Sequence, residues 1–386
     1  MSASKRVKRD FADPTEIALY RLGCGADMQA ALGVSDEASC LDYTAWCSDH
    51  GLSGDACLQE FFNVRLNDSS LSFRNPIIGS NTTIDGRGAH PEFLFSGFSI
   101  GAADGDTPTA TAESVILTYL TFRGAGHDED HDLDPDMIRS TGASHDIWIH
   151  KNEFDHTGDS AFDVKVGAYN ITMSFNLLRN VKRASLHGSS DSREINAQIT
   201  TTMHNNAFIT TDDMYAYFGS GGRRVPLIRR GRTHMFNNLF YGYRKDIMSI
   251  RVGAQVRFED NVFLNDVFNE KEDDIEYLLE NLIRDYDEGN IVVTGSRVWI
   301  SDRNCRLDTG QTGDLTLSFG TVDTMTDDYE DASRASLQSF RLPIGQDLVD
   351  YILATVGPDG AAPFNSPLAH PPSDVMGLAP ADGCRQ

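Results

Sequence analysis

The chain has 386 residues, 40% of them hydrophobic, and a formal net charge of −24 at pH 7. This composition is typical of a globular protein with a sizeable core, and it excludes a disordered chain. The acidity argues against nucleic acid as a partner, because nucleic acid is usually bound by a basic domain. No apolar run approaches the ~20 residues that span a bilayer, so we expect no membrane contact.

The first part of the chain, residues 1–76, combines helix-like stretches at 15–22 and 27–32 with most of the cysteines. An even number of clustered cysteines predicts a disulfide-stapled segment and a secreted protein, with six buried free thiols as the alternative. Residues 1–9 are charged and lack the apolar part of a signal peptide, so we expect a mature form. The cysteines are Cys24, Cys40, Cys47, Cys57, Cys305 and Cys384.

A weak repeat occupies residues 77–266. Segments 77–88 and 115–122 are predicted strands with glycine turns, and five later strands each end at an asparagine that is followed two positions later by an apolar residue. These asparagines are spaced by 24, 30, 32 and 23 residues. Strand repeats of this length predict a parallel β-helix with about three short strands in each coil. The asparagines are Asn152, Asn176, Asn206, Asn238 and Asn261.

In this interpretation the apolar residues face the interior, and the asparagines stack at one turn so that each amide bonds the neighbouring coils. The residue two positions after the asparagine is phenylalanine in four coils and Leu178 in the fifth. A β-sandwich with asparagine-rich turns is the alternative, and the fivefold recurrence disfavours it.

Two pairs of carboxylates lie one predicted coil apart, at Asp134 and Asp136 and at Asp159 and Asp163. Four such charges on one face would repel one another unless a hard cation bound between them. Ca²⁺ prefers six to eight oxygen ligands, whereas Zn²⁺ is disfavoured because no Cys or His has ligand spacing. A solvated acidic face is the alternative.

Basic residues follow the carboxylates. Lys182 and Arg183 lie one coil later, with surface charges as the alternative interpretation. Residues 223–251 contain eight basic residues and a single acid. They include the motif Arg-Val-Pro-Leu-Ile-Arg, which runs from Arg224 to Arg229. A concentrated positive strip on an acidic chain predicts a site for an anionic ligand.

The last part, residues 267–386, is acidic, and its best helix candidates are 270–287 and 347–356. A β-helix has open ends that expose strand edges, and we expect both flanks to cap them. Binding modules are the alternative. The predicted fold is therefore all-β, a right-handed parallel β-helix over 77–266 with helical and disulfide-bearing flanks.

In this order of carboxylates, basic pair and Arg-x-Pro-x-x-Arg, the sequence resembles the pectate lyase and pectin lyase family of parallel β-helix enzymes. The resemblance covers about half of the chain, while residues 1–76 depart from it. The segments that carry it are 80–84, 136–139, 147–150, 163–165 and 224–229, with Gly231, His234, Asn237 and Asn238.

The resemblance implies a role for each matching residue. Asp134, Asp136, Asp159 and Asp163 match calcium ligands. Arg224 matches the proposed general base and Arg229 the residue that grips the substrate carboxylate. Arg183, with Lys182 beside it, stands where the family usually has a substrate-binding lysine, and His234 is a further substrate-binding candidate.

The implied activity is Ca²⁺-dependent β-elimination on polygalacturonate by a secreted monomer. Ca²⁺, Arg229 and Arg183 would neutralise the uronate carboxylate while Arg224 takes the proton from C5. Pectin lyases lack the full carboxylate set, so its presence favours a charged substrate. The alternatives are a lyase for another polyuronate such as alginate or glucuronan, a non-catalytic carbohydrate-binding β-helix, and a hydrolase of the polygalacturonase type.

Overall fold

The structure is a computed structural model of the 386-residue chain. The residues that it describes are 26–36, 43–53, 56–57, 60, 75–94, 97–123, 136–157, 159–211, 222–242, 247–266, 283–284, 290–301, 311–319 and 342–362.

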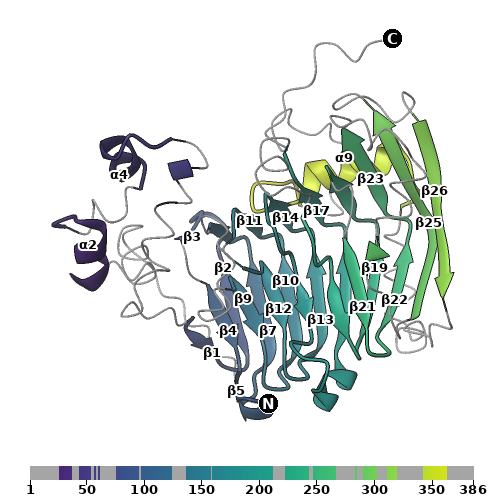
Figure 1. The fold of residues 1–386 in the computed structure, drawn as a ribbon, viewed down its shortest axis with the longest axis horizontal. Helices are drawn as coiled ribbons and strands as arrows, with labels where there is room; N and C mark the ends of the chain where they lie inside the picture. The colour runs from purple at the N-terminus through teal and green to yellow at the C-terminus, as the bar shows by residue number, and fades with distance from the viewer. Residues whose placement is uncertain are drawn as a thin grey trace.

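The chain winds into a right-handed parallel β-helix, in which successive coils stack their strands into three parallel sheets (Figure 1). We call these sheets the first, second and third stacks. The first stack holds β1 (Ile77–Ile78), β4 (Phe98–Ile100), β9 (Ile138–Ser140), β12 (Phe162–Val164), β15 (Leu186–His187), β18 (Leu227–Arg229), β21 (Met248–Arg251) and β24 (Ile283–Arg284).

The second and third stacks complete each coil. The second stack holds β2 (Thr82–Asp85), β7 (Glu113–Thr118), β10 (His145–His150), β13 (Tyr169–Ser174), β16 (Thr200–His204), β19 (Arg232–Phe236) and β22 (Gln255–Glu259). The third stack holds β3 (Glu92–Leu94), β8 (Thr121–Arg123), β11 (Glu153–Asp155), β14 (Leu177–Arg179), β17 (Ala207–Ile209), β20 (Leu239–Tyr241) and β23 (Val262–Asp266). The long strand β25 (Asn290–Ser301) pairs with β22 through its first half and with β23 through its second.

The asparagine ladder predicted from the repeat is confirmed. The Asn206 side-chain amide donates to Met173 O at 3.0 Å and to Asn238 Oδ1 at 3.0 Å, and Asn152, Asn176 and Asn238 repeat the pattern. At the end of the series the Asn261 amide donates to Met235 O at 3.1 Å. Ser296 Oγ accepts the backbone amide of Asn261 at 3.1 Å and so occupies the next position of the ladder. These side chains satisfy backbone groups at a turn buried inside the stack.

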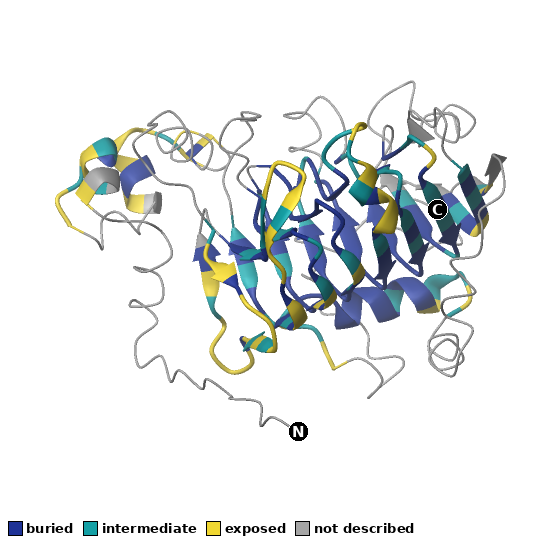
Figure 2. Cartoon of the chain, turned by 90° about the horizontal axis from the view of Figure 1, so that it is seen from below, coloured by how far each residue is buried: buried dark blue, intermediate teal, exposed yellow. Residues whose placement is uncertain are grey.

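The interior is filled by the residues that alternate inward along each strand (Figure 2). Phe208 and Phe240 stack with ring centroids 4.9 Å apart, and Phe240 and Phe263 with centroids 4.5 Å apart. The residue two positions after each ladder asparagine is therefore a core residue, as the sequence predicted.

In the described part of the C-terminal flank, a strand and a helix follow the coils. The strand β26 (Gln311–Phe319) pairs antiparallel with β25, so the outer edge of the last coil is covered by a strand. The helix α9 (Gln346–Thr355), predicted at 347–356, packs its apolar residues along the third stack beside the coils and does not cap an end (Figure 2).

The parallel strands continue to Ser301, beyond the predicted boundary at 266, because β24 and β25 extend the stacks. Most of the helix expected over 270–287 lies outside the described residues, and the described part, Ile283–Arg284, is strand β24.

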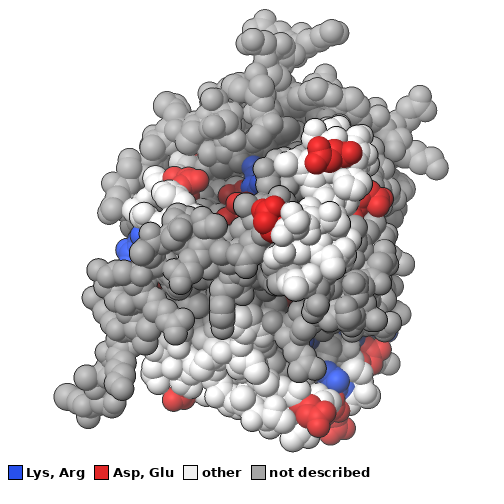
Figure 3. Space-filling model, turned by 90° about the vertical axis from the view of Figure 1, so that its left-hand side faces the viewer, with Lys and Arg blue, Asp and Glu red and all other residues white. Residues whose placement is uncertain are grey.

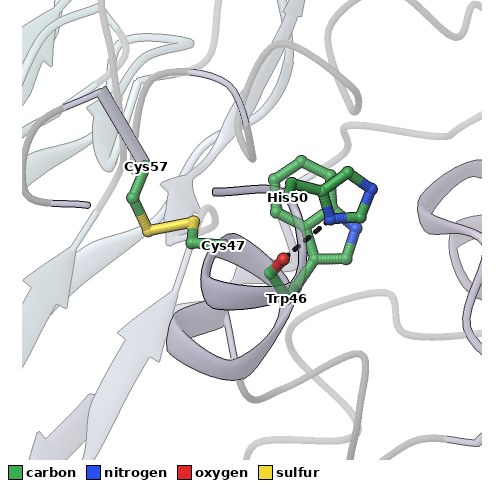
Figure 4. The surroundings of a disulfide bond; sticks show 4 residues. All are labelled: Trp46, Cys47, His50 and Cys57. Carbon is green, nitrogen blue, oxygen red and sulfur yellow. Dashed lines mark hydrogen bonds between the residues drawn. A yellow bond between two sulfur atoms is a disulfide. The ribbon is translucent and has the colours of Figure 1, made fainter. Parts of the chain in front are cut away.

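The N-terminal flank contains the short helices α2 (Ala26–Leu32), predicted at 27–32, and α4 (Tyr43–Asp49), which lie beyond the first coil (Figure 1). A disulfide joins Cys47 to Cys57, and His50 Nδ1 lies 2.7 Å from Trp46 O (Figure 4). Trp46 Nε1 donates to Leu32 O at 3.0 Å. The predicted helix at 15–22 and the other four cysteines lie outside the described residues.

Candidate functional site

A cavity of about 530 Å³ opens over the outer face of the first stack. Ser99, Leu186 and Arg229 reach it from strands β4, β15 and β18, since every second residue of a strand points outward. The hairpin of β5 (Ala102–Asp104) and β6 (Thr107–Ala110), inserted in the second coil, forms a wall of the cavity. The charged side chains of the lining are Arg139, Asp159, Lys165, Arg193, Arg224 and Arg229.

Two of the predicted calcium ligands are bridged by a lysine. Lys165 Nζ lies 2.8 Å from Asp136 Oδ2 and 3.0 Å from Asp163 Oδ2. Arg139 Nε donates to the same oxygen of Asp136 at 3.1 Å. Both aspartates are buried, so these contacts supply the opposite charge that a buried carboxylate requires. Asp134, the fourth predicted ligand, lies outside the described residues.

The third described ligand candidate, Asp159, faces two arginines. Its Oδ1 accepts from Arg183 Nη1 at 3.0 Å and lies 3.7 Å from Arg224 Nη1. Burial raises the pKa of the Asp159 carboxyl, and repulsion from Asp136 acts in the same direction, while both arginines oppose the shift.

The basic pair is divided between the interior and the surface. Arg183, predicted to contact substrate, is 2% exposed and is not among the residues that line the cavity. Arg183 donates to Asp159, so its position is that of a support for that carboxylate. Lys182 is half-buried, and it too is absent from the lining.

Arg224 and Arg229 both line the cavity, but their backbone conformations differ. Arg224 has a φ of +58°, a conformation uncommon for a residue other than glycine, and stands before the cis peptide bond between Val225 and Pro226. Arg229 projects from β18, with Nη1 donating to Gly188 O at 2.8 Å and Nε to Asp191 Oδ1 at 2.6 Å. Burial lowers the pKa of the Arg229 guanidinium, and Asp191 opposes that shift.

His234 lies elsewhere. It belongs to β19 of the second stack, and its Nε2 is 2.9 Å from Glu259 Oε2. It is absent from the lining of the cavity, so the structure does not bring this substrate-binding candidate together with Arg224 and Arg229.

The donor chemistry bears on the expected Ca²⁺. Among the described residues, no group of three or more His, Cys, Asp or Glu side chains is arranged to hold a metal ion. Asp136, Asp159 and Asp163 nevertheless supply buried carboxylate oxygens, the ligand type that Ca²⁺ prefers. The donors therefore fit Ca²⁺ by type, and a bound ion would share two of these carboxylates with Lys165.

Sequence reasoning assigned no role to Lys165 or Arg139. Lys165 follows Asp163 by two positions, and this spacing along an extended segment directs both side chains to the same side. Arg139 is the register partner of Asp163 on the neighbouring strand β9. The alternation of side chains along a strand could have identified Lys165, and the register between neighbouring strands could have identified Arg139.

Comparisons with known proteins agree with the fold. A family model described as pectate lyase matches residues 68–281, more than half of the chain. The chain is 35% identical over 193 residues to a pectate trisaccharide-lyase of Bacillus licheniformis, a match that covers 48% of this chain and 49% of that protein. It is 30% identical over 200 residues to pectate lyase B of Dickeya chrysanthemi, covering 47% and 49%.

The chain thus spans about half the length of the curated relatives it matches. A solved thermostable pectate lyase superposes with a TM-score of 0.54 at 20% identity, over 78% of this chain and 73% of that structure, and supports the fold. Within the described residues, no helix has the length and apolar character needed to cross a membrane.

Proposed function

This chain belongs to the pectate lyase family, and on that premise we propose that it cleaves polygalacturonate by β-elimination. The observation that carries the proposal is the cavity over the first stack. It brings Lys165, Arg224 and Arg229 together beside three buried carboxylates, in a protein that is otherwise strongly acidic. Such a site suits a sugar chain that bears carboxylates.

The elimination removes the proton from C5 and breaks the C4–O bond. A base takes the proton from C5 of the uronate, the electron pair forms the C4–C5 double bond, and the C4–O bond breaks so that the leaving oxygen acquires a proton. The negative charge that develops at the carboxylate is the main contribution to the activation barrier. Preorganised cations stabilise this charge and so lower the barrier. In this proposal Arg229, held by Gly188 O, and Lys165 stabilise that charge.

Arg224 is the proposed base. It lines the cavity with its side chain 20% exposed, which limits competition from water. Arg229 lines the same cavity, and Arg183 donates to the carboxylate of Asp159, which lies 3.7 Å from Arg224 Nη1. Arg183 acts indirectly in this scheme, because it holds Asp159 and does not line the cavity.

Ca²⁺, held by Asp136, Asp159 and Asp163 together with Asp134, would supply further positive charge for the uronate carboxylate. The disulfide between Cys47 and Cys57 supports the proposal of a secreted enzyme, since disulfides persist in oxidising compartments.

The test follows the ultraviolet absorbance of the unsaturated product on polygalacturonate at alkaline pH, with Ca²⁺ and with chelator. We expect a Ca²⁺-dependent rise and a loss of kcat of about 10³-fold in Arg224→Ala, as for removal of a general base. Arg232→Ala is the matched control, because Arg232 lies on β19 and is not part of the cavity lining. It should keep its activity within about twofold.

Other outcomes would favour the alternatives. Release of reducing ends without ultraviolet absorbance, unaffected by chelator, would indicate a hydrolase. Activity confined to alginate or glucuronan would indicate a lyase for another polyuronate. Binding of polygalacturonate with no cleavage of any polyuronate would indicate a carbohydrate-binding β-helix.

A further inference from the structure

The segment of residues 188–193, which follows β15, brings an acidic side chain to the basic residues of the cavity. Gly188 has a φ of +91°, and a Cβ there would lie 3.0 Å from Arg229 O and 3.2 Å from Arg229 Cβ. Glycine therefore lets the segment pass directly against β18. Three residues later the chain presents Asp191.

Asp191 contacts three arginines. Its Oδ1 accepts from Arg229 Nε at 2.6 Å and its Oδ2 from Arg251 Nη2 at 2.9 Å, while its carbonyl oxygen accepts from Arg230 Nε at 3.1 Å. Charge-assisted hydrogen bonds from guanidinium groups to both oxygens are a common arrangement for binding a carboxylate. Arg229 and Arg251 are register partners on β18 and β21, so the strand pairing places them together.

The side chains of Arg229 and Asp191 differ in exposure. Arg229 is 14% exposed and lines the cavity, whereas the Asp191 side chain is 47% exposed and is absent from the lining. Exposed ion pairs contribute little to stability, so solvent and other anions compete effectively for such a carboxylate. Asp191 is thus a displaceable partner of a less exposed arginine.

The same segment is anchored at its far end. Arg193 pairs through Nε with Asp106 at the tip of the β5–β6 hairpin. Ser189, Arg193 and the hairpin residue Gly105 all line the cavity. The segment and the hairpin therefore form a continuous border, and the anchor keeps Asp191 beside Arg229.

We propose that Asp191 is a specificity-determining residue, which competes with a substrate carboxylate for Arg229 and Arg251. The inference rests on the proposed function and deepens it. A carboxylate-bearing hexuronate engages the two arginines by displacing Asp191, so the internal acid weakens binding of the charged sugar at this position. Removal of the competing charge strengthens that binding.

The experiment measures trigalacturonate binding by calorimetry in the presence of chelator, so that no turnover occurs, and KM and kcat on polygalacturonate with Ca²⁺. Asp191→Asn retains the shape of the side chain and removes its charge. We expect the Kd and KM to fall by about fivefold, the scale of an exposed ion pair, with kcat unchanged. Asp191→Glu retains the charge and should bind like the wild type.

Asp104→Asn is the matched control, since Asp104 is an exposed acidic residue of β5 at the same border and lies outside the Arg193–Asp106 anchor. An Asp191→Asn variant that binds trigalacturonate no more tightly than the wild type would overturn the proposal and indicate a residue that only orients Arg229. Equal tightening in Asp104→Asn would also overturn it, because the effect would then be one of general charge. A wild type that neither binds nor cleaves uronates would instead refute the proposed function.

Discussion

Lys151 shows how one side chain joins distant parts of this protein. Lys151 is 0% exposed and has a φ of +53° at the turn before Asn152. Its Nζ donates to Thr355 O at 2.5 Å, to Gly360 O at 2.9 Å and to Ala361 O at 3.1 Å. An ammonium group carries three donors, and a cation at a helix C-terminus is favoured by the helix dipole. Lys151 thereby attaches the end of α9 to the coils.

Burial lowers the pKa of Lys151 from 10.5 to about 8. Below pH 8 the lysine is protonated in both the folded and the unfolded chain. Between about pH 8 and 10.5 the folded protein releases the proton while the unfolded chain retains it, so the free energy of unfolding increases with pH. Relative to Lys151→Met, the wild type should gain up to about 3 kcal/mol over this window.

Urea unfolding at several pH values from 7 to 10.5 measures this difference. Lys182→Met removes a half-buried lysine and serves as the control for the contribution of other lysines to the pH dependence of the free energy of unfolding. A difference between wild type and Lys151→Met that stays constant with pH would show that Lys151 keeps the same protonation in both states.

At the scale of elements, the asparagine ladder connects the coils through the turn between the second and third stacks. Asn206 Oδ1 accepts from the backbone amide and the side-chain amide of Asn176, and its own amide donates to Met173 O and Asn238 Oδ1. A buried ladder of this kind is cooperative, because each amide polarises the next.

Asn206→Ala should lower the free energy of unfolding by about 3 kcal/mol or more, since buried backbone and amide groups lose their partners. Ser296→Ala, at the end of the ladder, removes one hydrogen bond to Asn261 N and should cost about 1 kcal/mol. Denaturant melts of both variants make the comparison. Equal losses would contradict a ladder whose central members carry more hydrogen bonds than its end.

At the scale of the whole molecule, a basic cavity belongs to a body with a net charge of −24. Viewed from the side on which α2 and α4 lie, the described surface shows scattered acidic side chains and few basic ones (Figure 3). The body should repel a polyanion at long range, whereas the arginines of the cavity attract it at contact. Salt screens the long-range part first, because the Debye length is about 10 Å at 0.1 M and about 3 Å at 1 M.

The KM for polygalacturonate should therefore pass through a minimum at intermediate ionic strength. Initial rates at a fixed Ca²⁺ activity, from low salt to about 1 M NaCl, measure this dependence. A KM that rises steadily from the lowest salt would show that the local attraction dominates at every distance.

The sequence by itself determined the parallel β-helix, because the fold repeats a local pattern. The asparagines and the residues two positions later occupy equivalent places in successive coils, and periodicity alone reveals them. The sequence also identified Asp136, Asp159, Asp163, Arg224 and Arg229, which the structure gathers at or beside one cavity. The C-terminal limit of the coils could not be predicted from the sequence, because β24 and β25 continue the stacks without the asparagine pattern.

Only the tertiary structure decided what each charged side chain contacts. Register across coils placed Lys165 between two aspartates, buried Arg183 against Asp159 and set His234 on another stack. Asp191 carried no motif, and its role emerges only because the segment after β15 turns back onto β18. Contacts of this kind depend on loops and on strands far apart in sequence, and local patterns do not encode them.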